Sequence, residues 1–123
     1  MPNENKQTGL WGEDIAVAYL RDKGYEILQR NFTRRVGEID IIARDGKTVV
    51  FVEVKLRKGT YYGSPAEYVN AAKRRRLLLT AELWLQAHPR EFRSRFDVIE
   101  ILAPQGQATQ RLKINHIEDA YES

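Results

Sequence analysis

The sequence predicts a single mixed α/β domain in the order helix, three strands, helix, two strands. An Asp-Gly pair joins two alternating apolar runs, which indicates a β-hairpin, and two segments with helical periodicity flank that hairpin along the chain. The chain has 123 residues, near the usual size for one independent fold. We therefore expect one domain over residues 1–123, with residues 1–7 as a flexible tail.

The first helix is expected from residue 8 or 9 to residue 23, with Gly24 as its stop. Apolar residues recur on one face of this segment at helical spacing. They are Trp11, Ile15, Ala18 and Tyr19. Glu13 lies off this apolar stripe, so the sequence by itself favours an exposed helix acid at that position.

Three strands follow, over residues 25–32, 38–44 and 48–56. Asp45 and Gly46 are expected to be the two central residues of a type I′ turn, which requires positive φ angles. Such a loop places Asp40 opposite Phe51. Because side chains alternate along a strand, Asp40, Glu53 and Lys55 then share one face, and the Cβ atoms of the two acids lie roughly 7 Å apart.

Two carboxylates on a largely buried face are costly unless a cation neutralises them. Hard cations such as Mg²⁺ bind oxygen ligands from one or two carboxylates together with water and phosphate. Asp40 and Glu53 therefore indicate a divalent-ion site with Lys55 beside it. The alternative is an edge-strand charge or a structural salt bridge between these acids and Lys55.

The second half of the chain predicts a helix and two strands. Residues 64–67 read as a capping box that begins a helix ending near residue 87, before Pro89. Strands are expected over residues 95–102 and 111–117, with a turn at 104–107. For Asp97 we expect a structural bond to a nearby Arg or backbone amide. His88 and His116 have no second His at ligand spacing, so neither is expected to bind a metal.

An ordered set of residues resembles a known family. Asp40, followed after the hairpin by Glu53-Val54-Lys55, is similar to the signature of the PD-(D/E)XK nuclease superfamily, and Glu13 resembles the extra acid of its Holliday-junction-resolvase-like branch. Ile39 stands where that signature has Pro. Over most of the chain the motifs resemble those of the uncharacterised bacterial YraN-like family. These are Gly12-Glu13, Leu20, Gly24-Tyr25, Arg30-Asn31, residues 37–40, residues 51–55 and residues 95–98.

The resemblance implies a restriction-endonuclease-like core, with a central mixed sheet flanked by helices. It also implies a metal-dependent nuclease that hydrolyses phosphodiester bonds of branched or structured DNA in repair or recombination. Mg²⁺ or Mn²⁺ would be held by Asp40, Glu53 and the Val54 carbonyl, with Glu13 binding directly or through water, and Lys55 would orient or deprotonate the attacking water. The alternative is a nucleic-acid-binding accessory module that has this fold without robust cleavage.

The net charge is only +3, from 20 Lys and Arg against 17 Asp and Glu, so it is no argument for nucleic acid by itself. The local clusters of basic residues say more, since they predict a phosphate-binding rim. Its members would be Arg34, Arg35, Arg57, Lys58, Lys73, Arg74, Arg75 and Arg76. The alternative for each cluster is a solvated surface.

Apolar residues occupy more of the second helix than one core-facing stripe requires, which indicates either a homodimer or a fully enclosed helix. The sequence has no cysteine, which is compatible with a reducing cytoplasm. No apolar stretch approaches membrane-spanning length. We therefore expect a cytoplasmic protein with no membrane partner.

Overall fold

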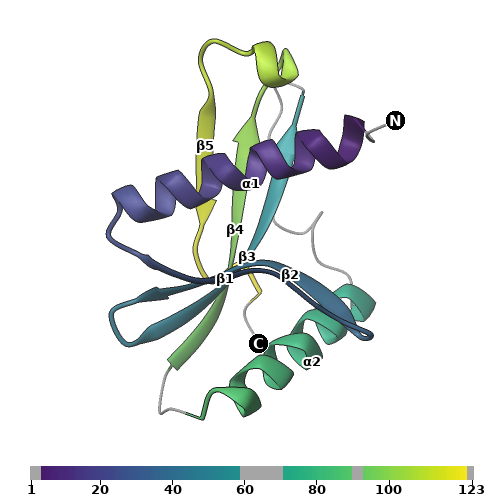
Figure 1. Cartoon of the computed structure of the whole chain (residues 1–123), viewed down its shortest axis with the longest axis vertical. Coiled ribbons are helices and arrows are strands. Elements are labelled where there is room, and N and C mark those ends of the chain that lie inside the picture. The colour runs from purple at the N-terminus through teal and green to yellow at the C-terminus, as the bar shows by residue number, and fades with distance from the viewer. Residues whose placement is uncertain (1–3, 59–70, 90–92, 122–123) are drawn as a thin grey trace.

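The computed structural model describes residues 4–58, 71–89 and 93–121. Two helices and five strands follow one another in the predicted order, which confirms the expected mixed α/β fold (Figure 1). The elements are α1 (Glu4–Asp22), β1 (Glu26–Arg34), β2 (Gly37–Asp45), β3 (Thr48–Arg57), α2 (Ala71–Ala87), β4 (Arg93–Leu102), a short 3₁₀ helix η2 (Gly106–Ala108) and β5 (Lys113–Ile117).

The five strands form one sheet in the order β1-β2-β3-β4-β5. β3 and β4 are parallel, and the other neighbouring strands are antiparallel. A parallel pair needs a long crossover, and α2 lies within the segment that joins β3 to β4. This crossover brings the basic first turns of α2 next to the sheet.

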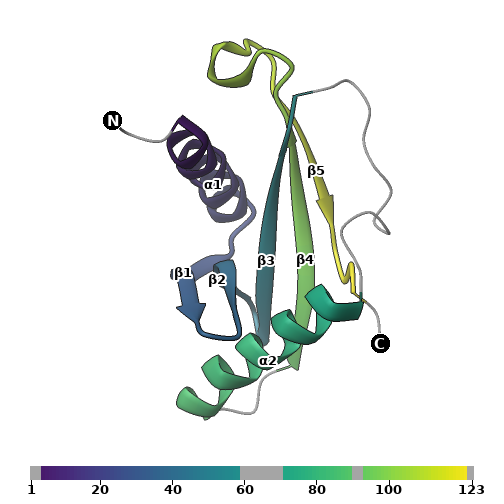
Figure 2. The same ribbon diagram turned by 90° about the vertical axis from the view of Figure 1, so that its right-hand side faces the viewer.

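The two helices pack on opposite faces of the sheet (Figures 1 and 2). On the α1 face, Ala16, Val17 and Leu20 contact strand residues that include Val50 and Ile99. A second cluster lies on the α2 face and contains Phe32, Phe51, Leu77, Ala81, Trp84 and Val98. The middle residues of β2 and β3 are therefore buried on both faces, and a charge placed among them has little access to water.

The β2–β3 turn differs by one residue from the prediction. Asp45 pairs with Thr48, so the loop is Gly46 and Lys47 rather than Asp45 and Gly46. Gly46 alone adopts the positive φ, 61°, that the turn requires, which leaves Asp45 free to stay in the ladder. The predicted pairing of Asp40 with Phe51 is therefore wrong, because Phe51 pairs with Ile42.

The sheet opens into a fork at Asp40. Pairing between β2 and β3 ends at Ile41 and Val52, whereas pairing between β1 and β2 continues to Arg34 and Gly37. In Figure 1 the β1–β2 hairpin accordingly runs across the upright strands β3, β4 and β5.

The side-chain alternation also breaks at this fork. Ile41 packs on the α1 face, but Ile39, two residues away, packs on the α2 face. Asn31 of the neighbouring strand has a φ of 53°, a conformation rare for residues other than Gly. This local twist directs Asp40 into the opening between β2 and β3.

α2 lies directly on the β2 arm of the fork. A Cβ added to Gly37 would meet Thr80 Oγ1 at 2.8 Å, so only glycine permits this approach. Thr80 is fully buried, and its hydroxyl donates to the Arg76 carbonyl at 2.7 Å. The contact fixes the position of Arg76 relative to the fork.

Other boundaries differ modestly from the predictions. α1 begins at Glu4, so residues 4–7, expected to belong to a flexible tail, are helical. β5 begins at Lys113 rather than residue 111, and η2 occupies part of the expected turn. The predicted start of the second helix at Ser64 lies outside the described residues. No helix in the described ranges combines the length and apolar character needed to cross a membrane.

Candidate active site

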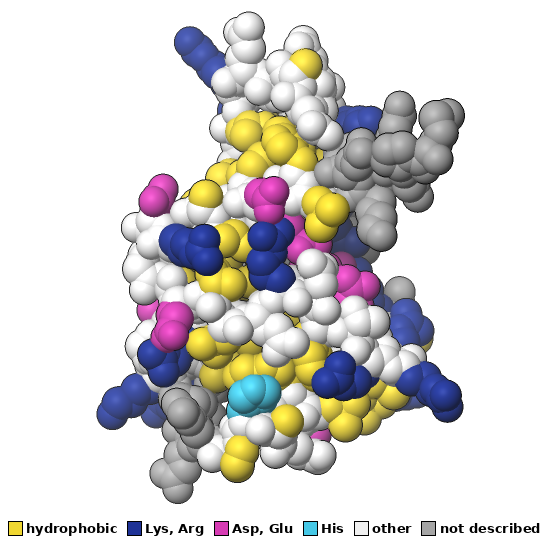
Figure 3. Space-filling model, in the orientation of Figure 1, with side chains coloured by type: hydrophobic (Ala, Val, Ile, Leu, Met, Phe, Trp, Pro, Cys, Tyr) yellow, Lys and Arg dark blue, Asp and Glu magenta, His cyan; other side chains and the backbone are white. Residues whose placement is uncertain are grey.

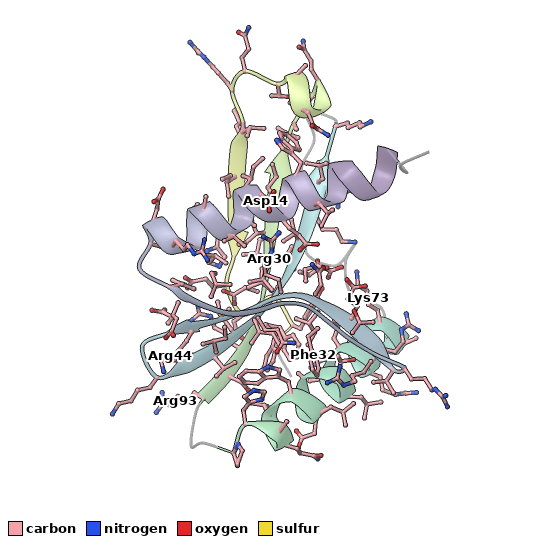
Figure 4. All side chains as sticks on the ribbon, viewed as in Figure 1. Asp14, Arg30, Phe32, Arg44, Lys73 and Arg93 are labelled. Carbon is pink, nitrogen blue, oxygen red and sulfur yellow. The ribbon has the colours of Figure 1, made fainter. Side chains whose placement is uncertain are left out.

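Glu13 reaches the fork from α1 and is 9% exposed. Its Oε1 atom is buried, and among the described residues it has no hydrogen-bond partner. Arg30 Nη2 lies 3.6 Å from this oxygen, and Figure 4 shows Arg30 beneath α1 beside Asp14. Burial raises the pKa of Glu13 because Arg30 and Asn31 offset the loss of solvent only in part. The sequence-based expectation of an exposed acid at Glu13 is wrong.

Asp40 lies where β2 leaves β3. Its Oδ2 accepts a hydrogen bond from the Val54 backbone N–H at 2.8 Å. Burial raises the pKa of Asp40 to about 6, and the negative charges of Glu13, Glu53 and Glu38 add to this rise. Three neighbouring acids therefore oppose the ionisation of Asp40 at the fork.

Glu53 has the opposite electrostatic environment. Its Oε1 is bound by Lys73 of α2 and lies 3.2 Å from Lys55 Nζ, while its Oε2 accepts a hydrogen bond from the Tyr121 hydroxyl. Burial alone would raise the pKa of Glu53, but these three partners outweigh it and hold that pKa below its usual value. Glu53 is thus ionised and held at both oxygens.

A cavity of about 370 Å³ opens between the two arms of the fork and α2. Asp40 lines it from β2 and Glu53 from β3, so the two acids face the same space, as the sequence predicts. Lys73 and Arg76 of α2 also line it. Figure 4 shows Lys73 at the end of α2 beside the β2 arm. The apolar residues of the lining are Ile39, Phe51, Val52, Leu77 and Phe96.

Glu38 connects this cavity to a second hollow on the α1 side. It lines the first cavity together with Asp40, and it lines the second together with Glu13 and Asn31. The acids of α1 and β3 therefore approach the fork from opposite sides of the β2 arm. In Figure 3 acidic side chains lie among basic ones across the middle of the molecule.

The donors at the fork suit a hard divalent cation because they are all oxygens. The buried Oε1 of Glu13 lacks a partner, and Asp40 is repelled by three neighbouring carboxylates, so a cation would relieve both. Within residues 4–58, 71–89 and 93–121, however, no three His, Asp or Glu side chains have the spacing of a formed metal site. Glu53 is instead turned toward Lys73, Lys55 and Tyr121.

The basic residues predicted to bind nucleic acid lie in three places. Arg34 and Arg35 are exposed at the tip of the β1–β2 hairpin, with the Arg34 guanidinium 4.3 Å from the Phe32 ring centroid. Arg74, Arg75 and Arg76 lie on α2, the last two exposed. These two groups flank the fork.

The other predicted basic residues lie at the far end of β3. Arg57 is half-buried, with its Nε 3.6 Å from Oε2 of the fully buried Glu100. Asn115 also donates to Glu100, at 3.0 Å. Lys58 follows at an exposed position. Arg57 therefore has a structural partner, which separates it from the exposed arginines around the fork.

Sequence reasoning did not assign Tyr121 any role, and it placed Lys73 only in the phosphate-binding rim. Both residues bind Glu53, one from the C-terminal segment and one from α2. Neither stands in a recognisable spacing with Glu53, because the contacts join residues 20 and 68 positions apart. No sequence signal could have identified them.

Asp97, a further buried acid, lies on the α1 face and is fully bonded. It accepts hydrogen bonds from Arg95 Nε at 3.0 Å and Nη2 at 3.2 Å, and from the Asp119 backbone N–H at 3.0 Å. The expectation of a structural bond to an Arg or a backbone amide is confirmed. His116 Nε2 also lies 2.7 Å from its Oδ2. Although burial opposes it, these partners lower the pKa of Asp97.

Two tyrosines extend this network. Arg95 Nη2 donates to the Tyr25 hydroxyl at 2.7 Å, and the Tyr19 hydroxyl lies 3.3 Å from His116 Nδ1. We call Arg95, Asp97 and His116, with Tyr19 and Tyr25, the Asp97 cluster. It joins the end of α1 and the start of β1 to β4 and β5.

Comparison with known proteins identifies similar chains over nearly the full length. The model of an uncharacterised protein family, UPF0102, matches residues 12–101. A UPF0102 protein of Syntrophomonas wolfei is 47% identical over 118 residues, covering 95% of this chain and 99% of the relative. One from Rhodococcus opacus is 46% identical over 118 residues, covering 95% and 98%. One from Clostridium tetani is 52% identical over 103 residues, covering 83% and 84%.

Proposed function

The chain belongs to the uncharacterised protein family UPF0102, as its ordered motifs suggest, and we propose that it is a metal-dependent nuclease. Its reaction would be hydrolysis of phosphodiester bonds in branched or otherwise structured DNA, in the cytoplasm. The observation that supports this proposal is the gathering of Glu13, Asp40 and Glu53 at one fork, with Lys55 beside Glu53.

The acids of the fork are more numerous than a structural role requires. A salt bridge between one acid and Lys55 would need neither Glu13 nor Asp40, yet both are withdrawn from water and both have raised pKa values. Buried carboxylates with poor compensation are common at functional sites because the cost of burial is tolerated there. The oxygen-rich fork favours Mg²⁺ or Mn²⁺ over a softer metal.

Asp40, Glu53 and the Val54 carbonyl would hold the ion, with Glu13 binding directly or through water. When bound, the ion would polarise the scissile phosphate and stabilise the negative charge that builds on the phosphate oxygens. Lys55, 3.2 Å from Glu53 Oε1, would orient the attacking water or assist its deprotonation. Arg76 lines the cavity and would bind a phosphate of the substrate.

Two features support a branched or structured substrate. Exposed arginines flank the fork on the β1–β2 hairpin and on α2. The phosphate backbones of two DNA arms that run in different directions could therefore each bind arginines. α2 also exposes Leu78, Leu79 and Leu83, at 48%, 49% and 41%. A homodimer through this surface would present two sites, which suits a junction with more than one scissile strand.

A cleavage assay on labelled DNA tests the proposal. Four-way junctions, flaps, single strands and linear duplexes are incubated with the protein and Mg²⁺ or Mn²⁺, with EDTA as the blank. We expect cleavage of a branched substrate by wild type and loss of at least a hundredfold in Asp40→Asn. If wild type binds branched DNA but cuts none of these substrates with either metal, the accessory-module function replaces the nuclease.

A matched pair of variants separates cleavage from binding. Lys55→Ala should lose cleavage but keep most DNA affinity, because one cation among many contributes little to total phosphate attraction. Changing Arg74, Arg75 and Arg76 together to Ala should weaken binding to every DNA. The logarithmic salt slope should fall by about one unit for each lost phosphate contact. An unchanged salt slope would show that the α2 arginines form a solvated surface only.

A further inference from the structure

We infer that Lys73 is a tethered counter-ion of Glu53, displaced when a divalent ion binds at the fork and thereby released toward a substrate phosphate. The inference rests on the proposed metal site and adds to it a residue, a contact that must break and an order of events. In the structure Lys73 binds Glu53 Oε1, so the contact must open before that oxygen can ligate an ion.

The first argument is an imbalance of charge. Two ammonium groups, Lys55 and Lys73, share one oxygen of Glu53. In the part of the chain that the structure describes, no ion pair reaches Asp40, and Glu13 has only Arg30 at 3.6 Å. Cations are thus concentrated on one acid while its neighbours repel one another. A divalent ion shared by Asp40 and Glu53 would supply the positive charge that Asp40 lacks. Glu53 would then no longer need both of its ammonium partners.

Lys73 rather than Lys55 is the ammonium to leave. Lys55 stands two residues from Glu53 on the same strand face, so its backbone keeps it near that carboxylate. Lys73 belongs to α2, and its side chain is 25% exposed and lines the cavity beside Arg76. Rotation of its flexible stem would bring the ammonium toward Arg76, where a phosphate would find both cations.

Tyr121 keeps the carboxylate in place during this exchange. Its hydroxyl donates to Oε2, the oxygen that Lys73 does not bind, and Tyr121 is itself 8% exposed. Glu53 can therefore change its partner at Oε1 without losing its orientation. Tyr121 is a positioning residue in this scheme, since it acts on the ion only through Glu53.

Metal titration of lysine variants tests the displacement. Mn²⁺ binding is measured by calorimetry in wild type, Lys73→Met, Lys73→Arg and Lys47→Met, the last being an exposed lysine in the β2–β3 turn. We expect Lys73→Met to bind Mn²⁺ at least threefold more tightly, because a competing cation is gone. Lys73→Arg and Lys47→Met should remain within twofold of wild type.

The direction in which Lys73→Met changes Mn²⁺ affinity decides whether the inference holds. Mn²⁺ affinity that is equal or weaker in Lys73→Met overturns the inference, as does the absence of binding in both wild type and Lys73→Met. Binding in Lys73→Met alone supports it, since a bound lysine would then be what excludes the ion. Thermal unfolding of each variant verifies that the titrated protein is folded.

A second measurement needs no variant at Lys73. Trace acylation of wild type with acetic anhydride, followed by mass spectrometry, reports the reactivity of each lysine. Saturating Mg²⁺ should raise acylation of Lys73 at least threefold relative to Lys47 and Lys58, and Asp40→Asn should abolish this rise. Unchanged Lys73 acylation in metal-saturated wild type overturns the inference.

The two proposals can fail separately. A protein that binds Mn²⁺ with the expected dependence on Lys73 but cuts no DNA refutes the nuclease and leaves the exchange intact. If the protein cleaves DNA but its metal affinity is the same in wild type and Lys73→Met, the displacement of Lys73 is refuted and the nuclease function stands.

Discussion

Asp97 in its cluster and Glu13 and Asp40 at the fork are all withdrawn from water, but only Asp97 has partners that compensate its charge in full. Asp97 is fully buried and receives two bonds from Arg95, one from a backbone N–H and a close contact from His116. At the fork, Glu13 keeps a buried oxygen without a partner among the described residues. The pKa of Asp97 is lowered, whereas the pKa values of Glu13 and Asp40 are raised.

This difference shows that burial does not by itself mark a functional acid. A carboxylate whose lone pairs are satisfied stabilises the fold while ionised, and its removal leaves its donors unpaired. A carboxylate that is buried with poor compensation costs stability while ionised, and that cost indicates a ligand the fold does not itself supply. Ionised carboxylates therefore stabilise the fold at Asp97 and cost stability at Glu13 and Asp40.

The largest expected effect is at the Asp97 cluster. Asp97→Asn removes the charge that Arg95 and His116 face, so we expect a loss of about 3 kcal/mol in the free energy of unfolding. Urea titration at pH 7 measures it, with the exposed Asp22→Asn as a control that should change by less than about 0.5 kcal/mol. A loss in Asp97→Asn no larger than the control's would remove the contrast between the two regions.

The next effect is a gain and depends on pH. The pKa of Asp40 rises from 3.8 to about 6 on folding, so the folded state binds the extra proton, and stability falls as pH rises through this window. Asp40→Asn removes that dependence and should gain about 2 kcal/mol at pH 7, less than the full shift because the side chain is only half-buried. Urea titrations in EDTA at pH 4 and pH 7 measure both quantities.

Asp97 supplies the matched contrast in pH. Its folded pKa is lowered, so its stabilisation is present above its ordinary pKa and is lost as pH falls through the lower folded value. Between pH 4 and pH 7, Asp97→Asn should therefore leave the fall due to Asp40 in place. A variant of Asp40 with the wild-type pH dependence would show that the acids of the fork are better compensated than their contacts imply.

The smallest effect is at Glu13. Glu13→Gln keeps the shape of the side chain and removes a charge whose pKa burial raises, so we expect a gain of about 1 kcal/mol at pH 7. The gain should disappear when Mn²⁺ is added at saturating concentration, because the ion then neutralises the Glu13 carboxylate of wild type, whereas Glu13→Gln has no such charge to bind it. Chemical denaturation with and without metal tests this, and a loss of stability without metal would place Glu13 among structural acids like Asp97.

Local patterns predicted much of this comparison but not its electrostatics. Element order follows from periodicity and turn residues, and Glu53 and Lys55 share a face because strand alternation is a local rule. The pairing of Asp40 was predicted wrongly because Asp45, which was expected in the turn, instead pairs with Thr48 in the ladder. That error does not change the face, since Asp40 and Glu53 line one cavity.

The remaining contacts depend on tertiary structure. The Asp97 cluster brings together Tyr19, Tyr25 and His116, which no spacing rule connects. The exposure of Glu13 was predicted wrongly for a similar reason. An off-stripe helix position is buried here because the β1–β2 hairpin passes beneath α1, and one helical segment cannot reveal what its polar side will meet.

The crossover between β3 and β4 also sets the order in which this site can assemble. Asp40 and Glu53 belong to neighbouring strands joined by a two-residue turn, so an early hairpin brings them together at small entropic cost. Lys73 can join them only after α2 has packed on the β2 arm, and Tyr121 only after β4 has closed the parallel pair with β3, a slow, non-local step. The β2–β3 hairpin would therefore present the acid pair to divalent ions before Lys73 and Tyr121 can reach Glu53.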